Sequence, residues 1–243
     1  METQIIKIDK SDDSGIIKAA KLIKAGETVA FPTETVYGLG ANGLDETASA
    51  KIYEAKGRPS DNPLILHIDN IKMLPMITDN APQMALKIMA AFCPGPITVI
   101  VPKKDTVPDK ITGGLSTVGV RMPDNDIARK LISLSGTPIA APSANLSGRP
   151  SPTTAKAVYD DLNGRIPLIL DGGASDFGVE STIVDCTEDV PVILRPGAVT
   201  KEMLEEIFTE VRIDPALAGE NKIPKAPGMK YRHYAPRAPL ILL

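Results

Sequence analysis

Residues 45–68 of the chain read DETASAKIYEAKGRPSDNPLILHI, and this stretch indicates the architecture of the whole. Asp45 is a typical N-cap residue and Gly57 a typical helix stop, so the sequence predicts a helix over residues 45–56. A loop with two prolines follows, and the apolar run at residues 64–68 predicts a buried strand. Helix and strand at such close spacing are typical of a protein that mixes the two kinds of element.

The same alternation continues in both directions along the chain. Further helices are predicted over residues 14–25, 81–92, 125–135 and 200–208. Further strands are predicted over residues 28–31, 97–101, 118–121, 138–141, 168–170, 182–184 and 192–194. This mixture predicts an α/β fold, of the α+β type. Five prolines after residue 214 disfavour regular structure, which predicts a domain over residues 1–213 and a linker over residues 214–243.

Composition excludes several classes of protein. With 243 residues, of which 43% are hydrophobic and 23% charged, the chain can bury a full core. A net charge of -3 argues against a broad nucleic-acid surface, and the absence of Trp argues against a base-stacking platform. Cys93 and Cys186 lack metal-ligand spacing and are expected to be inert thiols. Without a signal-peptide pattern or a membrane-spanning run, the sequence predicts a cytosolic protein with no membrane contact.

Two proline-bracketed motifs carry the most informative polar side chains. Lys56 and Arg58 stand two residues apart, as do Ser143 and Asn145, so in an extended chain each pair projects to one side. An ammonium beside a guanidinium suits a polyphosphate, whereas a hydroxyl beside an amide suits a sugar or a base edge. Taken alone, each motif is also typical of an ordinary surface turn.

The sequence does not support several familiar catalytic and cofactor-binding motifs. Residues 38–43 match G-x-G-x-x-G, but residues 32–35 separate them from the preceding apolar run, which argues against a dinucleotide site. The sequence has no P-loop and no G-x-S-x-G elbow. Neither His67 nor His233 has metal-ligand spacing to another His or Cys. Covalent hydrolase chemistry and a structural metal therefore have no support.

Polar residues cluster where predicted strands begin or end, and together they predict a site for an anionic ligand. These residues are Thr33, Glu34, Thr35, Tyr37, Arg121, Ser181, Thr182 and Arg195. Each one alone is compatible with a turn cap or a surface ion pair. His67 is compatible either with the site or with a hydrogen-bonded core histidine.

Five motifs together resemble the YrdC-like threonylcarbamoyl-AMP synthases over essentially the whole chain. They are FPTETVYGLG at 31–40, KGRP at 56–59, PSANLSG at 142–148, ESTIVD at 180–185 and LRPG at 194–197. Residues 227–236, PGMKYRHYAP, resemble the interdomain linker of the longer, two-domain form, although Ala226 stands where that form commonly has Ser. The apolar run at 240–243 resembles the first strand of the C-terminal domain, so the resemblance implies that this chain lacks that domain.

The resemblance implies a twisted mixed sheet with flanking helices around a concave, positively charged cleft. The implied reaction joins L-threonine, bicarbonate and ATP, with Mg²⁺ accompanying the nucleotide and no tightly bound cofactor. The product, L-threonylcarbamoyladenylate, would pass to a tRNA-modifying transferase complex, and weak tRNA binding is expected. Two other functions stay open: an RNA-binding module, and a carbamoyl-transfer domain like that of hydrogenase-maturation enzymes, although C-x-x-C pairs are absent.

The resemblance also implies roles for individual residues. It assigns to threonine binding Thr35, His67, Arg121, the backbone of Ala141, and Ser181. It assigns to ATP binding Lys56, Arg58, Asn62, Thr117, Ser143, Asn145, Ser151, Arg195 and Tyr231. Lys56 and Arg58 are expected to meet the phosphates and are the candidates for catalysis, and residues 227–236 are expected to form a lid that brings Tyr231 to the nucleotide.

Overall fold

A computed structural model describes residues 2–9 and 11–215 of the chain. Its strands are β1 (Gln4–Lys7), β2 (Val29–Phe31), β3 (Gly38–Asn42), β4 (Ile65–His67), β5 (Ile97–Pro102), β6 (Thr117–Arg121), β7 (Ile139–Ala140), β8 (Leu168–Asp171), β9 (Thr182–Asp185), β10 (Val192–Arg195) and β11 (Arg212–Ile213). The helices are α1 (Ser14–Lys24), α2 (Glu46–Lys56), α3 (Gln83–Phe92), α4 (Asp109–Thr112), α5 (Asp126–Ser135), α6 (Ala155–Leu162) and α7 (Lys201–Glu205), with a 3₁₀ helix at Ile71–Met76.

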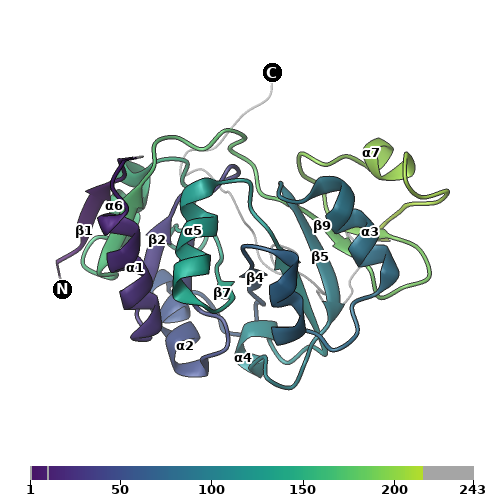
Figure 1. Cartoon of the computed structure of the whole chain (residues 1–243), viewed down its shortest axis with the longest axis horizontal. Coiled ribbons are helices and arrows are strands. Elements are labelled where there is room, and N and C mark those ends of the chain that lie inside the picture. The colour runs from purple at the N-terminus through teal and green to yellow at the C-terminus, as the bar shows by residue number, and fades with distance from the viewer. Residues whose placement is uncertain (1, 10, 216–243) are drawn as a thin grey trace.

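The strands form one mixed sheet in the order β1-β8-β2-β3-β7-β4-β6-β5-β9-β10-β11. The pairs β1/β8, β2/β8, β4/β6, β5/β9 and β10/β11 are parallel, and the others are antiparallel. In Figure 1 the sheet runs from the purple β1 beside the N-terminus towards β5 and β9, and the yellow-green α7 lies beyond them at the opposite end. Helices α1 and α5 pack together against the sheet. Mixed pairing with flanking helices is the predicted class of fold.

Short capping signals explain where the helices begin and end. The carboxylate of Asp45 accepts hydrogen bonds from the amides of Thr47 and Ala48, and Gly57 ends α2 in the left-handed region with φ of 59°. Asn125 caps α5 in the same way, and α5 ends at Gly136 with φ of 67°. Polar N-caps and left-handed glycines satisfy the free backbone groups at the two ends of a helix. The predicted helices at 45–56 and 125–135 are confirmed.

The glycine-rich motif at residues 38–43 forms strand β3 and not a phosphate-binding turn. A side chain on Gly40 would place its Cβ 2.6 Å from Cγ2 of Ile139 and 2.7 Å from Cε1 of Phe31. Glycine here leaves room for the Phe31 ring beside the strand. In a dinucleotide-binding unit the glycines form the turn after a strand, whereas here most of the motif lies within the strand itself.

Strand β7 joins two halves of the sheet. It contributes only Ile139 and Ala140, which pair with Asn42 and Ala41 of β3 on one side and with His67 and Leu66 of β4 on the other. The buried core is continuous across this junction, since both β7 residues belong to the same core cluster as Leu39 and Ala41 of β3 and Leu66 of β4. No helix in the described ranges is both long and apolar enough to cross a membrane.

The elements that escaped the sequence prediction are β1, β3, β11, α4, α6 and the 3₁₀ helix at Ile71–Met76. Strand β1 is exposed on most of its residues, so it lacks the apolar run by which the other strands are recognised. Helix α6 begins after Thr154, whose hydroxyl caps it, in a stretch where two prolines favour a loop. Helix α7 is shorter than predicted and ends at Glu205.

Candidate active site

A pocket opens where the ends of several strands meet on both sides of β7. Its wall is formed by Thr33, Val36, Tyr37, Gly38, Lys56, Arg58, Pro63, Leu64, Ile65, His67, Arg121, Ala141, Pro142, Ser143, Asn145, Ser147, Gly148, Arg149, Ser151, Glu180, Ser181 and Arg195. Strand ends are where loops from distant parts of a chain converge in open sheets. The pocket therefore brings together most of the residues that were predicted to form a site.

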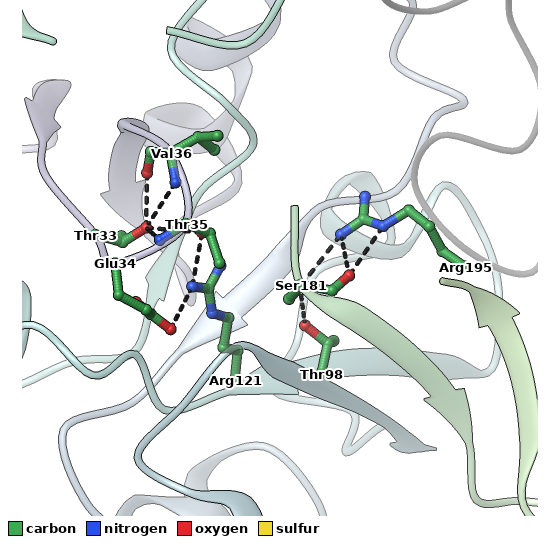
Figure 2. A network of polar contacts seen from close by, with 8 residues as sticks. All are labelled: Thr33, Glu34, Thr35, Val36, Thr98, Arg121, Ser181 and Arg195. Atoms are coloured by element: carbon green, nitrogen blue, oxygen red, sulfur yellow. Dashed lines mark hydrogen bonds and ion pairs between the residues drawn. The ribbon is translucent and has the colours of Figure 1, made fainter. Parts of the chain in front are cut away.

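Arg121, the last residue of β6, lies at the base of the pocket and is tied to the loop after β2. Its Nη2 donates to Oε1 of Glu34 at 2.7 Å and to Oγ1 of Thr35 at 2.8 Å (Figure 2). Both charged side chains are buried, with 6% of Arg121 and 3% of Glu34 exposed. The second carboxylate oxygen of Glu34 and Nε of Arg121 have no hydrogen-bond partner among the residues that the structure describes. Two of the five donors of the guanidinium are thus used inside the protein.

Two threonine hydroxyls extend this network. Oγ1 of Thr33 lies 2.9 Å from Oγ1 of Thr35 and donates to the carbonyl of Val36 at 2.6 Å. A hydroxyl has one proton, so the proton between the two threonines comes from Thr35. Thr35 is then free to accept from Arg121, as observed. The chain from Arg121 through Thr35 and Thr33 fixes the loop that forms one wall of the pocket.

Ser181 and Arg195 form a second polar group on the other side of Arg121 (Figure 2). Arg195, at the end of β10, donates through Nε and Nη2 to the carbonyl of Ser181 at 3.1 and 2.9 Å. Oγ of Ser181 lies 2.8 Å from Oγ1 of Thr98 and is fully buried. Two donors on one carbonyl oxygen hold the guanidinium of Arg195 in a fixed plane at the rim.

His67 ends β4 and lies between Arg121 and the core. Burial, and secondly the positive charge of Arg121, lower the pKa of His67 to about 3. Its Nδ1 lies 3.2 Å from the carbonyl of Ile65, and its ring meets that of Phe31 edge to face. Both open interpretations of this residue hold together: it is a buried, hydrogen-bonded histidine and it lines the pocket. It is neutral near pH 7.

The opposite wall carries the two predicted motifs. Nζ of Lys56 donates to the carbonyls of Ser143 and Asn145, and burial followed by the charge of Arg58 holds the pKa of Lys56 well below its usual value. Nη2 of Arg58 donates to the carbonyl of Pro63 at 3.1 Å. The two motifs, far apart in sequence, therefore meet in one place.

Not every predicted residue lies in the pocket wall. Thr35 and Asn62 are buried directly behind it, where the carbonyl of Asn62 lies 3.2 Å from the Tyr53 hydroxyl. Thr117 begins β6, at the end of that strand away from Arg121. Tyr231 and the predicted lid lie outside the described residues. Roles for all four residues stay predictions.

The structure adds pocket residues that the sequence did not single out as ligand contacts. Ser147, Gly148 and Arg149 continue the PSANLSG motif into the wall, and Glu180 accepts a hydrogen bond from Ser151. All but Arg149 belong to motifs that carried the family resemblance, so motif membership was the available signal. Arg149 pairs with Asp161 at 2.5 Å, a contact with no local signature in the sequence.

Tyr37 binds the loop after β8 to the pocket wall. Its hydroxyl donates to the carbonyl of Gly173 at 2.6 Å and accepts from the amide of Gly172 at 3.2 Å. Burial raises the pKa of Tyr37 to about 12. The adjoining loop is held by the backbone as well, because the amides of Asp176 and Phe177 both donate to the carbonyl of Glu34.

Comparison with protein families gives two matches. The family model described as "Telomere recombination", for the Sua5, YciO and YrdC proteins, matches residues 21–197, which is more than half of the chain. The model described as "Threonylcarbamoyl-AMP synthase, C-terminal domain" matches residues 199–243. The prediction that the chain lacks its C-terminal domain is therefore not borne out. It took residues 240–243 for the first strand of a missing domain, whereas the match to that domain begins at residue 199. The boundary between residues 213 and 214 stays a prediction.

Individual relatives are similar along nearly the whole chain. A curated threonylcarbamoyl-AMP synthase from Bacillus subtilis is 54% identical over 233 residues, and one from Pyrococcus abyssi is 55% identical over 226 residues. These alignments cover 96% and 93% of this chain but 67% and 66% of the relatives, so the chain spans about two thirds of their length. The solved structure of P. abyssi Sua5 complexed with L-threonine has a TM-score of 0.93 at 52% identity, covering 98% of this chain and 70% of that one. This likeness confirms the predicted fold.

Proposed function

This chain belongs to the Sua5, YciO and YrdC family, and on that premise we propose that it is a threonylcarbamoyl-AMP synthase. The proposed reaction joins L-threonine, bicarbonate and ATP into L-threonylcarbamoyladenylate, with release of pyrophosphate and water. It is a nucleotidyl transfer, because AMP passes from pyrophosphate to the carbamate oxygen. The similarity to P. abyssi Sua5, which was solved in complex with L-threonine, supports threonine as the amino-acid substrate.

The observation that carries the proposal is the placement of Arg121 at the base of the pocket. Nη2 of its guanidinium donates hydrogen bonds to Glu34 and Thr35, and other N–H groups of the guanidinium can donate to a ligand. A carboxylate is the natural partner for these donors, since charge-assisted pairs with Arg are strong and directional. The hydroxyl of Ser181 and the neutral ring of His67 lie in the same wall and can meet the threonine hydroxyl or amine.

The rest of the wall suits a nucleotide triphosphate. Arg58, Arg149 and Arg195 line the pocket beside Arg121, and Glu180 is the carboxylate in the described wall. Arg121 and Arg149 are already paired with Glu34 and Asp161, so Arg58 and Arg195 are the arginines of the wall that we expect to stabilise phosphate oxygens. Mg²⁺ would enter with ATP as part of the substrate. Ser143 and Ser151 add hydroxyls at the same rim. We assign the ATP side of the pocket to this group.

The chemistry asks the protein for positioning and charge neutralisation. Bicarbonate takes up a proton and loses water to give carbon dioxide, and the unprotonated amine of threonine attacks it to form a carbamate with release of a proton. An oxygen of the carbamate then attacks the α-phosphorus of ATP, and the bond to pyrophosphate breaks. The substrates supply the nucleophile, so the arginines need only hold the two reactants together and stabilise the charge that develops on the phosphates.

We place this reaction in the cytoplasm, where ATP and tRNA are available, and we expect the product to serve N6-threonylcarbamoyladenosine formation in tRNA. A tRNA-modifying transferase complex would consume the mixed anhydride soon after its release. The predicted lid at residues 227–236, with Tyr231 on the nucleotide, would limit hydrolysis before that transfer. These steps complete the proposal.

Pyrophosphate release tests the function directly. The full chain is assayed with ATP and Mg²⁺, and L-threonine and bicarbonate are left out in turn, with L-serine as the matched substrate. We expect release only when both co-substrates are present, and slower release with serine, which lacks the methyl group. Release at the same rate without threonine would overturn the proposal. RNA binding that weakens steeply with salt and survives without ATP, in a protein that releases no pyrophosphate, would favour the RNA-binding module.

A further inference from the structure

The ammonium group of Lys56 is fully occupied by the protein itself. Its Nζ lies 2.5 Å from the carbonyl of Ser143, 2.6 Å from the carbonyl of Asn145 and 3.3 Å from Oδ1 of Asn145. A lysine ammonium has three donors, so each of them has an acceptor. Only 2% of the residue is exposed. Lys56 borders the pocket but has no donor left for a ligand there.

The hydrogen-bonding groups of the Asn145 side chain are fully used as well. Its Oδ1 accepts from Nζ of Lys56 and from Oγ of Ser143, the latter at 2.5 Å. Its Nδ2 donates to the carbonyls of Leu146 and Arg149, both at 2.8 Å. An amide side chain offers two donors and two acceptor positions, and all four are used here. Asn145 therefore also has nothing left to give a nucleotide.

A backbone hydrogen bond joins the same two segments, with the donor now in the turn at residues 143–149. The amide of Ser147 donates to the carbonyl of Lys56 at 2.9 Å, directly before Gly57 ends α2. At the far side of the turn, the amide of Leu146 donates to Oδ2 of Asp161 at 3.0 Å. The turn at residues 143–149 is thus fixed to the end of α2 by bonds from both partners, and to α6 by Asp161.

We propose that Lys56 and Asn145 are positioning residues, which together form a latch that holds the 143–149 turn in the wall of the nucleotide site. Of each motif pair, one member builds the wall and its neighbour two residues away faces the ligand. These neighbours are Arg58 in the first motif and Ser143 in the second, whose hydroxyl gives its one proton to Asn145 and can accept a hydrogen bond from the ligand. This proposal rests on the proposed function for the identity of the ligand, ATP. It replaces the sequence-based expectation that Lys56 itself meets the phosphates.

The charge environment supports this division of labour. The burial that covers Lys56 also removes it from water, and carbonyl oxygens with the Asn145 amide take the place of that water. Turning Nζ towards a phosphate would leave three buried acceptors without this donor, which costs free energy that the new contact must first offset. Arg58, in contrast, is only partly buried and already lies at the rim.

Ionic strength separates a positioning lysine from a phosphate-binding one. Lys56→Met, Asn145→Ala, their double variant and Arg58→Met are compared for binding of ATP and of AMP by calorimetry at several salt concentrations. Loss of a charge that meets a phosphate makes ATP binding less sensitive to salt, because screening acts on the interaction that was lost. Arg58→Met should show this effect and should weaken ATP more than AMP.

For Lys56→Met we expect a different pattern. ATP and AMP affinity should fall by the same factor, on the order of tenfold, with the salt dependence of the remaining binding unchanged. Asn145→Ala should act alike, and the double variant should be no worse than either single one, because both break the same latch. A shallower salt dependence in Lys56→Met, with AMP binding intact, would overturn the proposal and return Lys56 to the phosphates.

Hydrogen exchange without nucleotide provides a second readout that does not depend on the ligand. Amides of the 143–149 turn should exchange faster in Lys56→Met and in Asn145→Ala, and at the wild-type rate in Arg58→Met. Unchanged exchange in the first two variants would refute the latch. If the wild-type chain binds no ATP, the proposed function fails while the exchange result still decides the latch.

Discussion

Replacing Arg121 with Met should destabilise the fold strongly, because it leaves a buried carboxylate without its partner. Oε1 of Glu34 would lose the 2.7 Å bond to Arg121, and its Oε2 has no partner already. Breaking a buried ion pair by removing one member costs about 3–5 kcal/mol. That is a large share of the roughly 5–15 kcal/mol by which proteins of this kind are stable. The midpoint of thermal unfolding should fall by about 10 °C.

The double variant Glu34→Leu, Arg121→Met separates this cause from a general loss of packing. Removing both charges leaves no uncompensated group, so we expect the double variant to recover most of the stability that Arg121→Met loses. Arg129→Met is the matched control. Its partner Asp126 lies three residues away with a side chain that is 96% exposed, and such a surface pair is worth about 0–1 kcal/mol.

Urea unfolding followed by circular dichroism gives the free energy of unfolding of the wild type, the single variants Arg121→Met and Glu34→Leu, the double variant and the control Arg129→Met. If the losses of the two single variants simply add in the double variant, the pair is uncoupled and the reasoning is refuted. A loss below about 1 kcal/mol in Arg121→Met would contradict burial of the pair as the cause. Calorimetry on the same proteins should show threonine affinity falling by about one to two decades in Arg121→Met, with ATP affinity much less affected.

Two further predictions concern residues around the pocket. The folded-state pKa of His67 is depressed to about 3, so between about pH 6.5 and pH 3 the unfolded chain binds a proton that the folded chain does not. The free energy of unfolding should therefore have its full value above pH 6.5 and decrease as the pH falls, by at most about 1.4 kcal/mol per pH unit. Urea unfolding at pH 7, 6 and 5 checks this, and an equal slope in His67→Gln would contradict it. Tyr37→Phe should cost about 0.5–1.5 kcal/mol, because the hydrogen bonds of its hydroxyl to the carbonyl of Gly173 and the amide of Gly172 are lost, while both glycines are exposed and can bond to water. Thermal unfolding of this variant within 1 °C of wild type would show that water replaces the hydroxyl without cost.

Much of the fold could be predicted because its helices carry local end signals. Asp45 with Gly57, and Asn125 with Gly136, mark α2 and α5 almost to the residue. Strand β3 was not predicted, since its glycines have low strand propensity and are there to make room for the Phe31 ring. That ring comes from another strand. A pattern read along the chain does not contain such a contact.

The same limit applies to the site. The two motifs at Lys56 and Ser143 could be paired on chemical grounds, and the structure brings them together. The sequence did not reveal that the ammonium of Lys56 donates to backbone carbonyls of the second motif, because donor and acceptors are 87 to 89 residues apart along the chain. It also did not reveal that Glu34 faces Arg121, 87 residues away. Residue types predicted the chemistry of the pocket, whereas long-range contacts decide which members of each motif remain available to a ligand.

The narrow junction at β7 gives bound substrate a mechanical role. Two residues of β7 hold the ladder between the halves of the sheet, and the pocket spans that junction with Tyr37 on one side and Arg121 on the other. A ligand that fills the pocket therefore connects the two halves of the sheet that this short strand joins. Threonine and ATP together should slow local opening at β7 more than they slow opening at the outer strands. Binding of substrate would then be measurable as slower local opening of the strands around β7.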